Sequence, residues 1–299
     1  MGMFIRFGFE FDIVSAGDIP MLLALLPHPE SGHTIIGDNR LKFQPNIPSS
    51  EFLDSYGNRI TRIVAPPGDL KIWTDCMAKT SGGPDIVAGE ARLQAVHELP
   101  DEVLTFLLPS RYCDSDALSE IAWNKFGDTS PGWERVQAIC DYVHNRITFG
   151  YQFSRVDKTA FDAHLEKAGV CRDFAHLAIS LCRVMNIPAR YASGYLGDIG
   201  VPSDGPNDFC AWFEVYLEDT WYTFDARYNV PRIGRILMVL GHDAADVAMI
   251  TSFGTHQLSH FSVWTWEMAE IKSAEEAREV LKQRVQADAV IRHSSARIA

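Results

Sequence analysis

The sequence predicts an α+β protein in which a β-rich, sandwich-like domain precedes a core of helices packed on an antiparallel sheet. Residues 1 to about 100 contain short β-favouring runs separated by Gly, Pro, Asn and Asp. From about residue 111, two helical patterns come first and two apolar strands come after a third helix. We therefore expect an N-terminal β-rich domain over residues 1–105, a core over 106–268 and a helical tail over 269–299.

The N-terminal runs have the spacing of a β-sandwich. The segment SYGNRITRIVAPPGDLKIWT predicts two strands that meet at the turn formed by residues 66–69, with a further turn at residues 56–58. A boundary follows, because Pro100 and Asp101 can open a short helix that Pro109 closes.

The core begins with two amphipathic patterns, which predict helices over residues 115–126 and 132–147. A third helix is expected from Cys171, and the strands AWFEVYL and TWYTFDAR follow, joined by a tight Glu218-Asp219 connection. The tail from Ser273 onward predicts a capped, charged helix whose apolar positions are Val280, Leu281, Val285 and Val290.

Composition excludes several classes of protein. An apolar fraction of 46% with 22% charged residues is typical of a globular chain, and a formal charge of −12 disfavours nucleic acid and anionic membranes as partners. The start of the chain has no signal-peptide pattern, so we expect a cytoplasmic protein with no membrane partner. The six cysteines form no CxxC pair, and we expect no cofactor and no metal. The sequence does not indicate an oligomeric state.

Cys171 is the candidate nucleophile, because it starts a helix. The apolar residues that follow it recur at the three- and four-residue intervals of a buried helical face, as Phe174, Leu177, Ala178, Leu181 and Cys182. At a helix N-terminus the macrodipole and unpaired N–H groups favour a thiolate and can bind an oxyanion. Gly169 is expected to allow substrate to approach the backbone. The alternative is a buried structural cysteine, which is our interpretation of Cys182.

The stretches GVCRDFAHLAISLCRVMNIPARYASGYL and DFCAWFEVYLEDTWYTFDARYN resemble the transglutaminase-like superfamily over residues 110 to 235. The resemblance implies a papain-like core and a Cys-His-Asp triad, in which a thiolate attacks an amide carbonyl to form a thioester. By position, Cys171 is the nucleophile and Asp225 is the orienting carboxylate. The histidine would stand before Ala211, where this chain has Cys210.

A cysteine in the position of the base changes the chemistry. An imidazole with a pKa near 6.5 exchanges protons at neutrality, whereas a thiol near 8.5 is mostly protonated. His176, His164 and Tyr228 are possible replacements; His176 lies about 140° round the helix from Cys171 and Tyr228 is a donor. Two hypotheses follow: an enzyme acting on peptide, protein or small amide substrates, or a degenerate binding or scaffold protein.

Other residues complete the candidate site. Trp212, Tyr151 and Tyr112 are candidates for substrate binding, as a groove wall or as hydrogen-bond donors. Cys171, Cys210 and Asp225 could alternatively bind a metal, and the two cysteines could form a disulfide under oxidation. Asp173 is expected to cap its helix, and Asp208 to lie in a turn. Three arginines, Arg227, Arg232 and Arg235, form a basic stripe expected to be mainly solvated.

Overall fold

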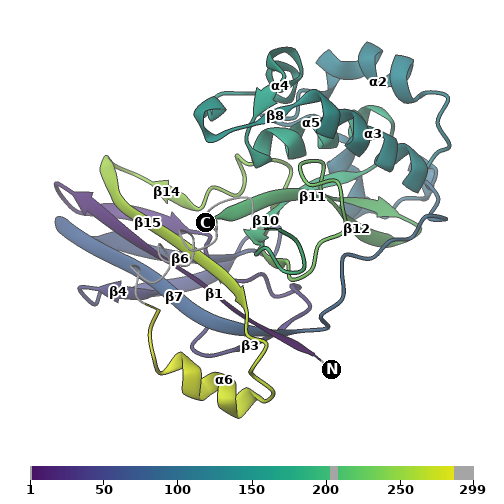
Figure 1. Ribbon diagram of the computed structural model, residues 1–299. Helices are drawn as coiled ribbons and strands as arrows, with labels where there is room; N and C mark the ends of the chain where they lie inside the picture. The colour runs from purple at the N-terminus through teal and green to yellow at the C-terminus, as the bar shows by residue number, and fades with distance from the viewer. Residues whose placement is uncertain (1, 203–207, 286–299) are drawn as a thin grey trace.

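The computed structural model describes residues 2–202 and 208–285, and it shows the expected mixture of helices and antiparallel sheets. Figure 1 shows the two parts of the molecule: strands from both ends of the chain form one, and helices α2 to α5 gather on a sheet in the other. No helix in these described ranges is long and apolar enough to cross a bilayer.

One sheet of the β-rich part has the strand order β15-β1-β7-β3, with β4 also paired to β7. All its pairings are antiparallel. The central strand β1 is Phe- and Ile-rich and almost wholly buried, as a strand covered on both faces requires. Its strands are β1 (Met3–Ser15), β3 (Thr34–Ile36), β4 (Lys42–Gln44), β7 (Gly68–Thr80) and β15 (His256–Glu267).

The second sheet has the order β14-β2-β6-β5 and shares an apolar core with the first. The turn predicted at residues 56–58 is confirmed, because β5 and β6 pair across it. The strands around residues 66–69 also exist, but they join different sheets. Pro66 and Pro67 offer no N–H group to continue a ladder, so the chain changes sheets there. The strands are β2 (Ile19–Leu23), β5 (Ser49–Leu53), β6 (Arg59–Ala65) and β14 (Ile250–Ser252).

Strands β14 and β15 belong to the β-rich part, whereas the sequence interpretation placed their residues in the core. Residues 250–267 fall within the expected core, yet β14 pairs with β2, and β15 pairs with β1 from Ile5↔Glu267 to Ser15↔His256. Alternation along a strand shows which face is buried but not which distant strand it joins. The two termini of the chain therefore build one β-rich part together.

The tail helix α6 (Ala274–Leu281) begins where the sequence predicts, with the Ser273 hydroxyl accepting the N–H of Glu276. It packs on the outer face of the first sheet against Phe4 and Met77. The apolar position Val290 lies outside the described residues.

A helical connection leads into the core. It contains short helices η1 (Val96–Glu98), α1 (Asp101–Leu104) and η2 (Thr105–Leu107). The three predicted core helices are found, the first of them with a 3₁₀ start: η3 (Ser115–Leu118) with α2 (Ser119–Phe126), α3 (Trp133–Arg146) and α5 (Cys171–Val184). Two further helices were not predicted, η4 (Tyr151–Phe153) and α4 (Ala160–Glu166). Short parallel strands β8 (Thr148–Phe149) and β9 (Ala168–Gly169) lie before α4 and α5.

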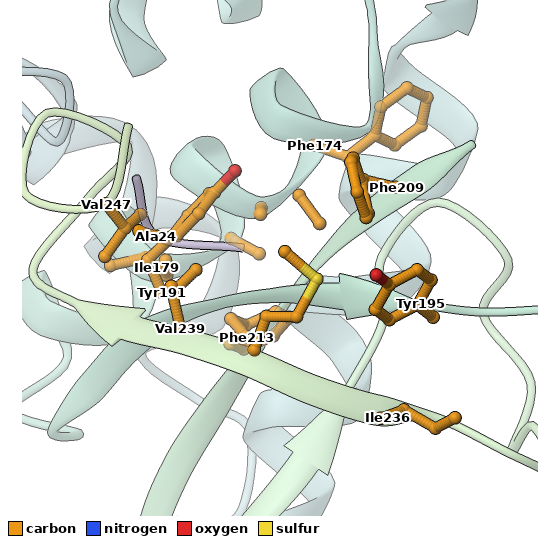
Figure 2. Packing of buried hydrophobic residues seen from close by; sticks show 14 of the residues in the cluster. Ala24, Phe174, Ile179, Tyr191, Tyr195, Phe209, Phe213, Ile236, Val239 and Val247 are labelled. Atoms are coloured by element: carbon orange, nitrogen blue, oxygen red, sulfur yellow. The ribbon is translucent and has the colours of Figure 1, made fainter. Parts of the chain in front are cut away.

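The core sheet has the order β12-β11-β10-β13 and is antiparallel. Its strands are β10 (Ala189–Tyr195), β11 (Phe209–Leu217), β12 (Thr220–Phe224) and β13 (Ile236–Gly241). Glu218 and Asp219 have φ of 45° and 61°, as a two-residue hairpin turn requires. Figure 2 shows Phe174 of α5 beside Phe209 and Tyr195 of this sheet in the buried cluster. This packing fixes the start of α5 against β10 and β11.

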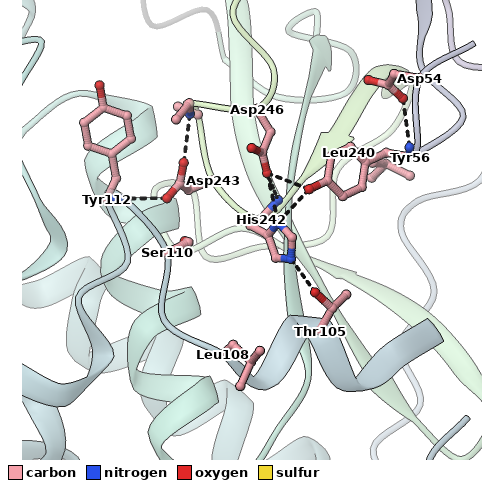
Figure 3. A network of polar contacts seen from close by, with 12 residues as sticks. Asp54, Tyr56, Thr105, Leu108, Ser110, Tyr112, Leu240, His242, Asp243 and Asp246 are labelled. Atoms are coloured by element: carbon pink, nitrogen blue, oxygen red, sulfur yellow. Dashed lines mark hydrogen bonds and ion pairs between the residues drawn. The ribbon is translucent and has the colours of Figure 1, made fainter. Parts of the chain in front are cut away.

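A polar network joins the β-rich part, the connection and the core (Figure 3). His242, which follows β13, lies 3.0 Å from Asp246 Oδ2 through Nδ1 and 2.7 Å from Thr105 Oγ1 through Nε2. The Tyr56 hydroxyl, from the turn between β5 and β6, donates to Asp246 at 2.9 Å. The Asn58 side chain adds hydrogen bonds to both backbone groups of Leu240. These contacts hold the β-rich part against the edge strand of the core sheet.

Candidate active site

Cys171 is the first residue of α5, as predicted, and its side chain is half-buried. The chain enters the helix through β9, and the N–H groups of Asp173 and Phe174 make the first bonds, to the carbonyl of Val170. The N–H groups of Cys171 and Arg172 precede these bonds. The sulfur therefore belongs to the first residue of a 14-residue helix, at the positive end of its dipole.

Asp173 caps this helix start, because its Oδ2 accepts the N–H of Val170 at 2.8 Å. Burial raises the pKa of the Asp173 carboxyl. Gly169 is needed for this cap, since a Cβ there would lie 2.5 Å from Asp173 Oδ2. The contact that explains this glycine is therefore within the protein, whereas the sequence interpretation assigned it to the approach of substrate.

Cys210 lies on β11, opposite Gly194 of β10, and Cys171 packs against the buried cluster that contains it. The Cys210 thiol, the N–H of Ala211 and the Arg227 guanidinium lower the pKa of Cys171, against the opposing effect of burial. The same thiol contact and burial raise the pKa of Cys210 well above its ordinary value. The interaction between the two thiols therefore favours the charged form of Cys171 and the protonated form of Cys210.

Asp225 is close to this pair in space but is bound to other groups. Its Oδ1 accepts the backbone N–H groups of Arg227 and Tyr228 at 2.9 and 3.1 Å, and its Oδ2 forms a buried ion pair with Arg235 at 2.9 Å. Arg235 in turn contacts Asp85 at 2.9 Å. Arg235 is thus the ion-pair partner of Asp225, whereas the family resemblance implies that this carboxylate orients a histidine.

Tyr151 lies beside Cys171, at the exposed side of the site. Its hydroxyl donates to Asp208 Oδ2 at 3.3 Å, and burial, Asp208 and the charge on Cys171 raise its pKa. Asp208 also accepts the N–H of Phe209, and burial raises the pKa of its carboxyl. Tyr151 is therefore a protonated hydroxyl next to the sulfur.

The other two candidates for substrate binding lie deeper. Trp212 is buried in the same cluster as Cys210, and the Arg235 guanidinium lies 4.9 Å from the centre of its ring. Trp212 also lines a cavity of about 300 Å³, together with Asp85. Tyr112 donates to the carbonyl of Val156. Of the three predicted contacts with substrate, the structure brings Tyr151 to the exposed side of Cys171.

The predicted replacements for the missing histidine all have other partners. His176 is buried between the rings of Tyr112 and Tyr191, and its Nε2 accepts the N–H of Ala244. Burial lowers its pKa to about 3. His164 contacts Tyr142, and burial with nearby Arg146 lowers its pKa. Tyr228 packs under the guanidinium of Arg232. Within the described ranges, no histidine contacts the Cys171 thiol.

Sequence reasoning missed the buried ion pairs around Asp225. Arg232 and Arg235 were expected on a solvated surface, but both are buried. Arg232 pairs with Asp198, and Arg235 pairs with both Asp85 and Asp225. Three arginines within ten residues of a carboxylate that had lost its histidine were a usable signal. Nothing near Asp85 in the sequence indicated its role. In the described part of the chain, no three His, Cys, Asp or Glu side chains converge as metal ligands.

Comparisons with known proteins agree with this geometry. Residues 122–226 match the family model of the Transglutaminase-like superfamily. The chain is 26% identical over 236 residues to "Uncharacterized protein ML0607" of Mycobacterium leprae, covering 75% of this chain and 82% of that protein. It is 27% identical over 216 residues to "Uncharacterized protein Rv2569c" of Mycobacterium tuberculosis, covering 65% and 68%.

A solved structure is similar over almost the whole length. The crystal structure named as a "Putative Cysteine Protease from Cytophaga hutchinsonii" superposes with a TM-score of 0.82 at 29% identity, covering 91% of this chain and 93% of that one. A cysteine at the start of a buried helix, packed on an antiparallel sheet, defines the class of papain-like thiol proteins. The family match over residues 122–226 and this structural similarity support membership of the transglutaminase-like superfamily.

Proposed function

We propose that this protein is a cysteine hydrolase or acyltransferase that acts on amide or peptide bonds through a thioester on Cys171. The observation that supports this most directly is the position of Cys171 at the start of α5, packed against the cluster that contains Cys210, whose thiol lowers the pKa of Cys171. A thiolate at a helix start is a nucleophile at neutral pH.

The chain's own residues account for each step. The Cys171 sulfur forms a bond to the carbonyl carbon, and the electron pair moves to the carbonyl oxygen beside the N–H groups of the first turn of α5. Collapse re-forms the carbonyl and breaks the C–N bond, and the leaving nitrogen takes the proton from Cys210. Water or an amine then attacks the thioester and returns a proton to Cys210. The products are an acid or a new amide, with both thiols restored to their starting state.

A proton-sharing thiol differs from an imidazole in how strongly it assists. General acid–base catalysis contributes about 10²–10⁴ in rate, and it is most effective when the pKa lies near the working pH. The raised pKa keeps Cys210 protonated while Cys171 is charged, so its proton is available to the leaving nitrogen, but the thiol is a weaker acid than an imidazolium. We therefore expect both halves of the reaction to be slower than with a histidine in this position.

A second candidate function is a binding or scaffold protein without turnover. The ion pair between Asp225 and Arg235 favours it, because a carboxylate held by arginine no longer orients a base. Under this alternative, Cys210→His alone restores little, since the new imidazole must compete with Arg235 for Asp225.

The two functions are separated by incubating the protein with a mixture of blocked synthetic peptide amides and following cleavage and thioester adducts by mass spectrometry. The enzyme hypothesis predicts an acyl adduct on Cys171 in the wild type, lost in Cys171→Ala and retained in the buried-thiol control Cys182→Ala. A wild type that forms no adduct and cleaves no peptide, while remaining folded by circular dichroism, supports the binding protein and contradicts the enzyme.

A further inference from the structure

The described chain contains two pairs of neighbouring thiols in very different surroundings. Cys171 packs against the buried cluster that contains Cys210, and its own side chain is half-buried. Cys140 of α3 and Cys182 of α5 are also close enough to interact, but both are fully buried, and burial raises the pKa of each. All four are free thiols in this structure, so the second pair is an internal control for the first.

We propose that Cys171 and Cys210 form an oxidative modification site, in which a peroxide oxidises Cys171 and Cys210 converts the product to a disulfide. The inference rests on the proposed function only in using the same Cys171 thiolate. It gives a further role to Cys210, the second thiol at the position where the family resemblance places a histidine.

The first step transfers two electrons to hydrogen peroxide. The Cys171 thiolate attacks one peroxide oxygen, an S–O bond forms, the O–O bond breaks, and hydroxide leaves to give a sulfenic acid. The hydroxide takes the proton held by Cys210 and becomes water. Cys210 can supply this proton, because Cys171 packs against its cluster and the raised pKa of Cys210 favours the protonated thiol.

The second step joins the sulfurs. The Cys210 thiolate attacks the sulfenic sulfur, an S–S bond forms, the S–O bond breaks, and the departing oxygen leaves as water after taking a proton from solvent. Two thiols are oxidised and one peroxide is reduced to two waters. A disulfide needs the sulfurs to close from contact to about 2.05 Å. A dithiol reductant reverses the modification and restores the nucleophile.

The position of Cys210 also protects Cys171. A sulfenic acid without a neighbouring thiol is oxidised further to sulfinic acid, which thiols do not reduce. Cys210 is held on β11 by the sheet, and Cys171 already packs against the cluster that contains it, so no movement of distant segments is required. The modification therefore stops at a reversible stage and switches off any chemistry of Cys171.

The test treats the full-length protein with hydrogen peroxide, alkylates the remaining thiols and maps peptides by mass spectrometry. The wild type is expected to lose two hydrogens, to yield a linked peptide pair containing Cys171 and Cys210, and to recover both thiols in dithiothreitol. Cys210→Ser is expected to gain two oxygens on Cys171 irreversibly. The control pair, Cys140 and Cys182, stays reduced in both proteins.

Two results overturn the inference: a wild type in which Cys171 reaches the sulfinic stage as readily as in Cys210→Ser, or one in which the linked peptide never forms. The wild-type map decides the matter even where the variant fails to fold. No amide substrate is present, so the outcome is separate from the proposed function. A reversible disulfide without peptide cleavage supports the modification site and contradicts the enzyme, and the reverse pattern contradicts the modification site alone.

Discussion

Replacing Cys210 by alanine removes the donor that stabilises the Cys171 thiolate. A hydrogen bond to a charged group contributes roughly 1.5–3 kcal/mol, and the weak S–H donor favours the lower end of that range. About 1.4 kcal/mol is a factor of ten in an ionisation equilibrium, so the thiolate population at neutral pH falls about tenfold. The N–H of Ala211 and Arg227 remain, so some thiolate persists.

The alkylation rate falls less than the population, because a more basic thiolate is a better nucleophile. With a Brønsted coefficient of about 0.4–0.5, a tenfold loss of thiolate lowers the rate about threefold at neutral pH and raises the plateau at high pH about threefold. The two pH–rate profiles should therefore cross. Cys210→Ser keeps a donor and should follow the wild type.

The assay is the rate of iodoacetamide labelling at Cys171 as a function of pH, read by peptide mass spectrometry, with buried Cys182 as the control thiol in each sample. Circular dichroism confirms that each variant is folded. The reasoning is refuted if the Cys210→Ala profile superimposes on the wild type, or if Cys171 reacts no faster than Cys182 in the unaltered protein.

Three further predictions concern the surroundings of the site. Asp225→Asn leaves the buried Arg235 with Asp85 as its one carboxylate partner. The free energy of unfolding, measured by urea denaturation, should fall by about 3 kcal/mol. A fall of less than about 1 kcal/mol would contradict the importance of the ion pair. His176 has a folded pKa of about 3 against about 6.5 unfolded, so only the unfolded chain gains this proton as the pH falls between these values. Between these two pH values, the free energy of unfolding should fall by at most about 1.4 kcal/mol for each unit by which the pH is lowered. In His176→Gln, the urea midpoint should depend less steeply on pH over the same range. An unchanged slope in the variant would contradict the lowered pKa of His176. Gly169→Ala places a Cβ 2.5 Å from Asp173 Oδ2 and should lower stability by about 1–3 kcal/mol, whereas Gly17→Ala, with nothing within 4 Å, should change it by less than about 0.5 kcal/mol. Equal melting temperatures for the two glycine variants would contradict the need for a glycine beside the Asp173 cap.

The sequence was sufficient to predict what depends on local pattern. The helix that starts at Cys171 follows from the spacing of the apolar residues after it, and the hairpin at Glu218-Asp219 follows from two apolar strands with a two-residue link. The position of Cys210 at the site came from the family resemblance. In each case the residues that decide the structure are neighbours in the chain.

What the sequence could not show depends on contacts between distant residues. The pairing of β15 with β1 joins opposite ends of the chain, and the alternation in either strand is satisfied by many partners. The ion pair of Arg235 with Asp85 spans 150 residues, so local charge patterning indicated only a surface stripe. The occupation of Asp225 by arginine is the consequence that matters most for function, since it separates this site from a histidine triad.

The charge on the Cys171 sulfur in the resting protein is the property on which the proposed chemistry and the oxidative site both depend. It is measured most directly as the ultraviolet absorbance of the thiolate, recorded against pH for the wild type and for Cys171→Ala. We expect a difference signal that is already present at pH 7, below the value near 8.5 of an ordinary cysteine. Identical spectra for the two proteins at pH 7, with a signal appearing only in alkaline solution, would contradict the account.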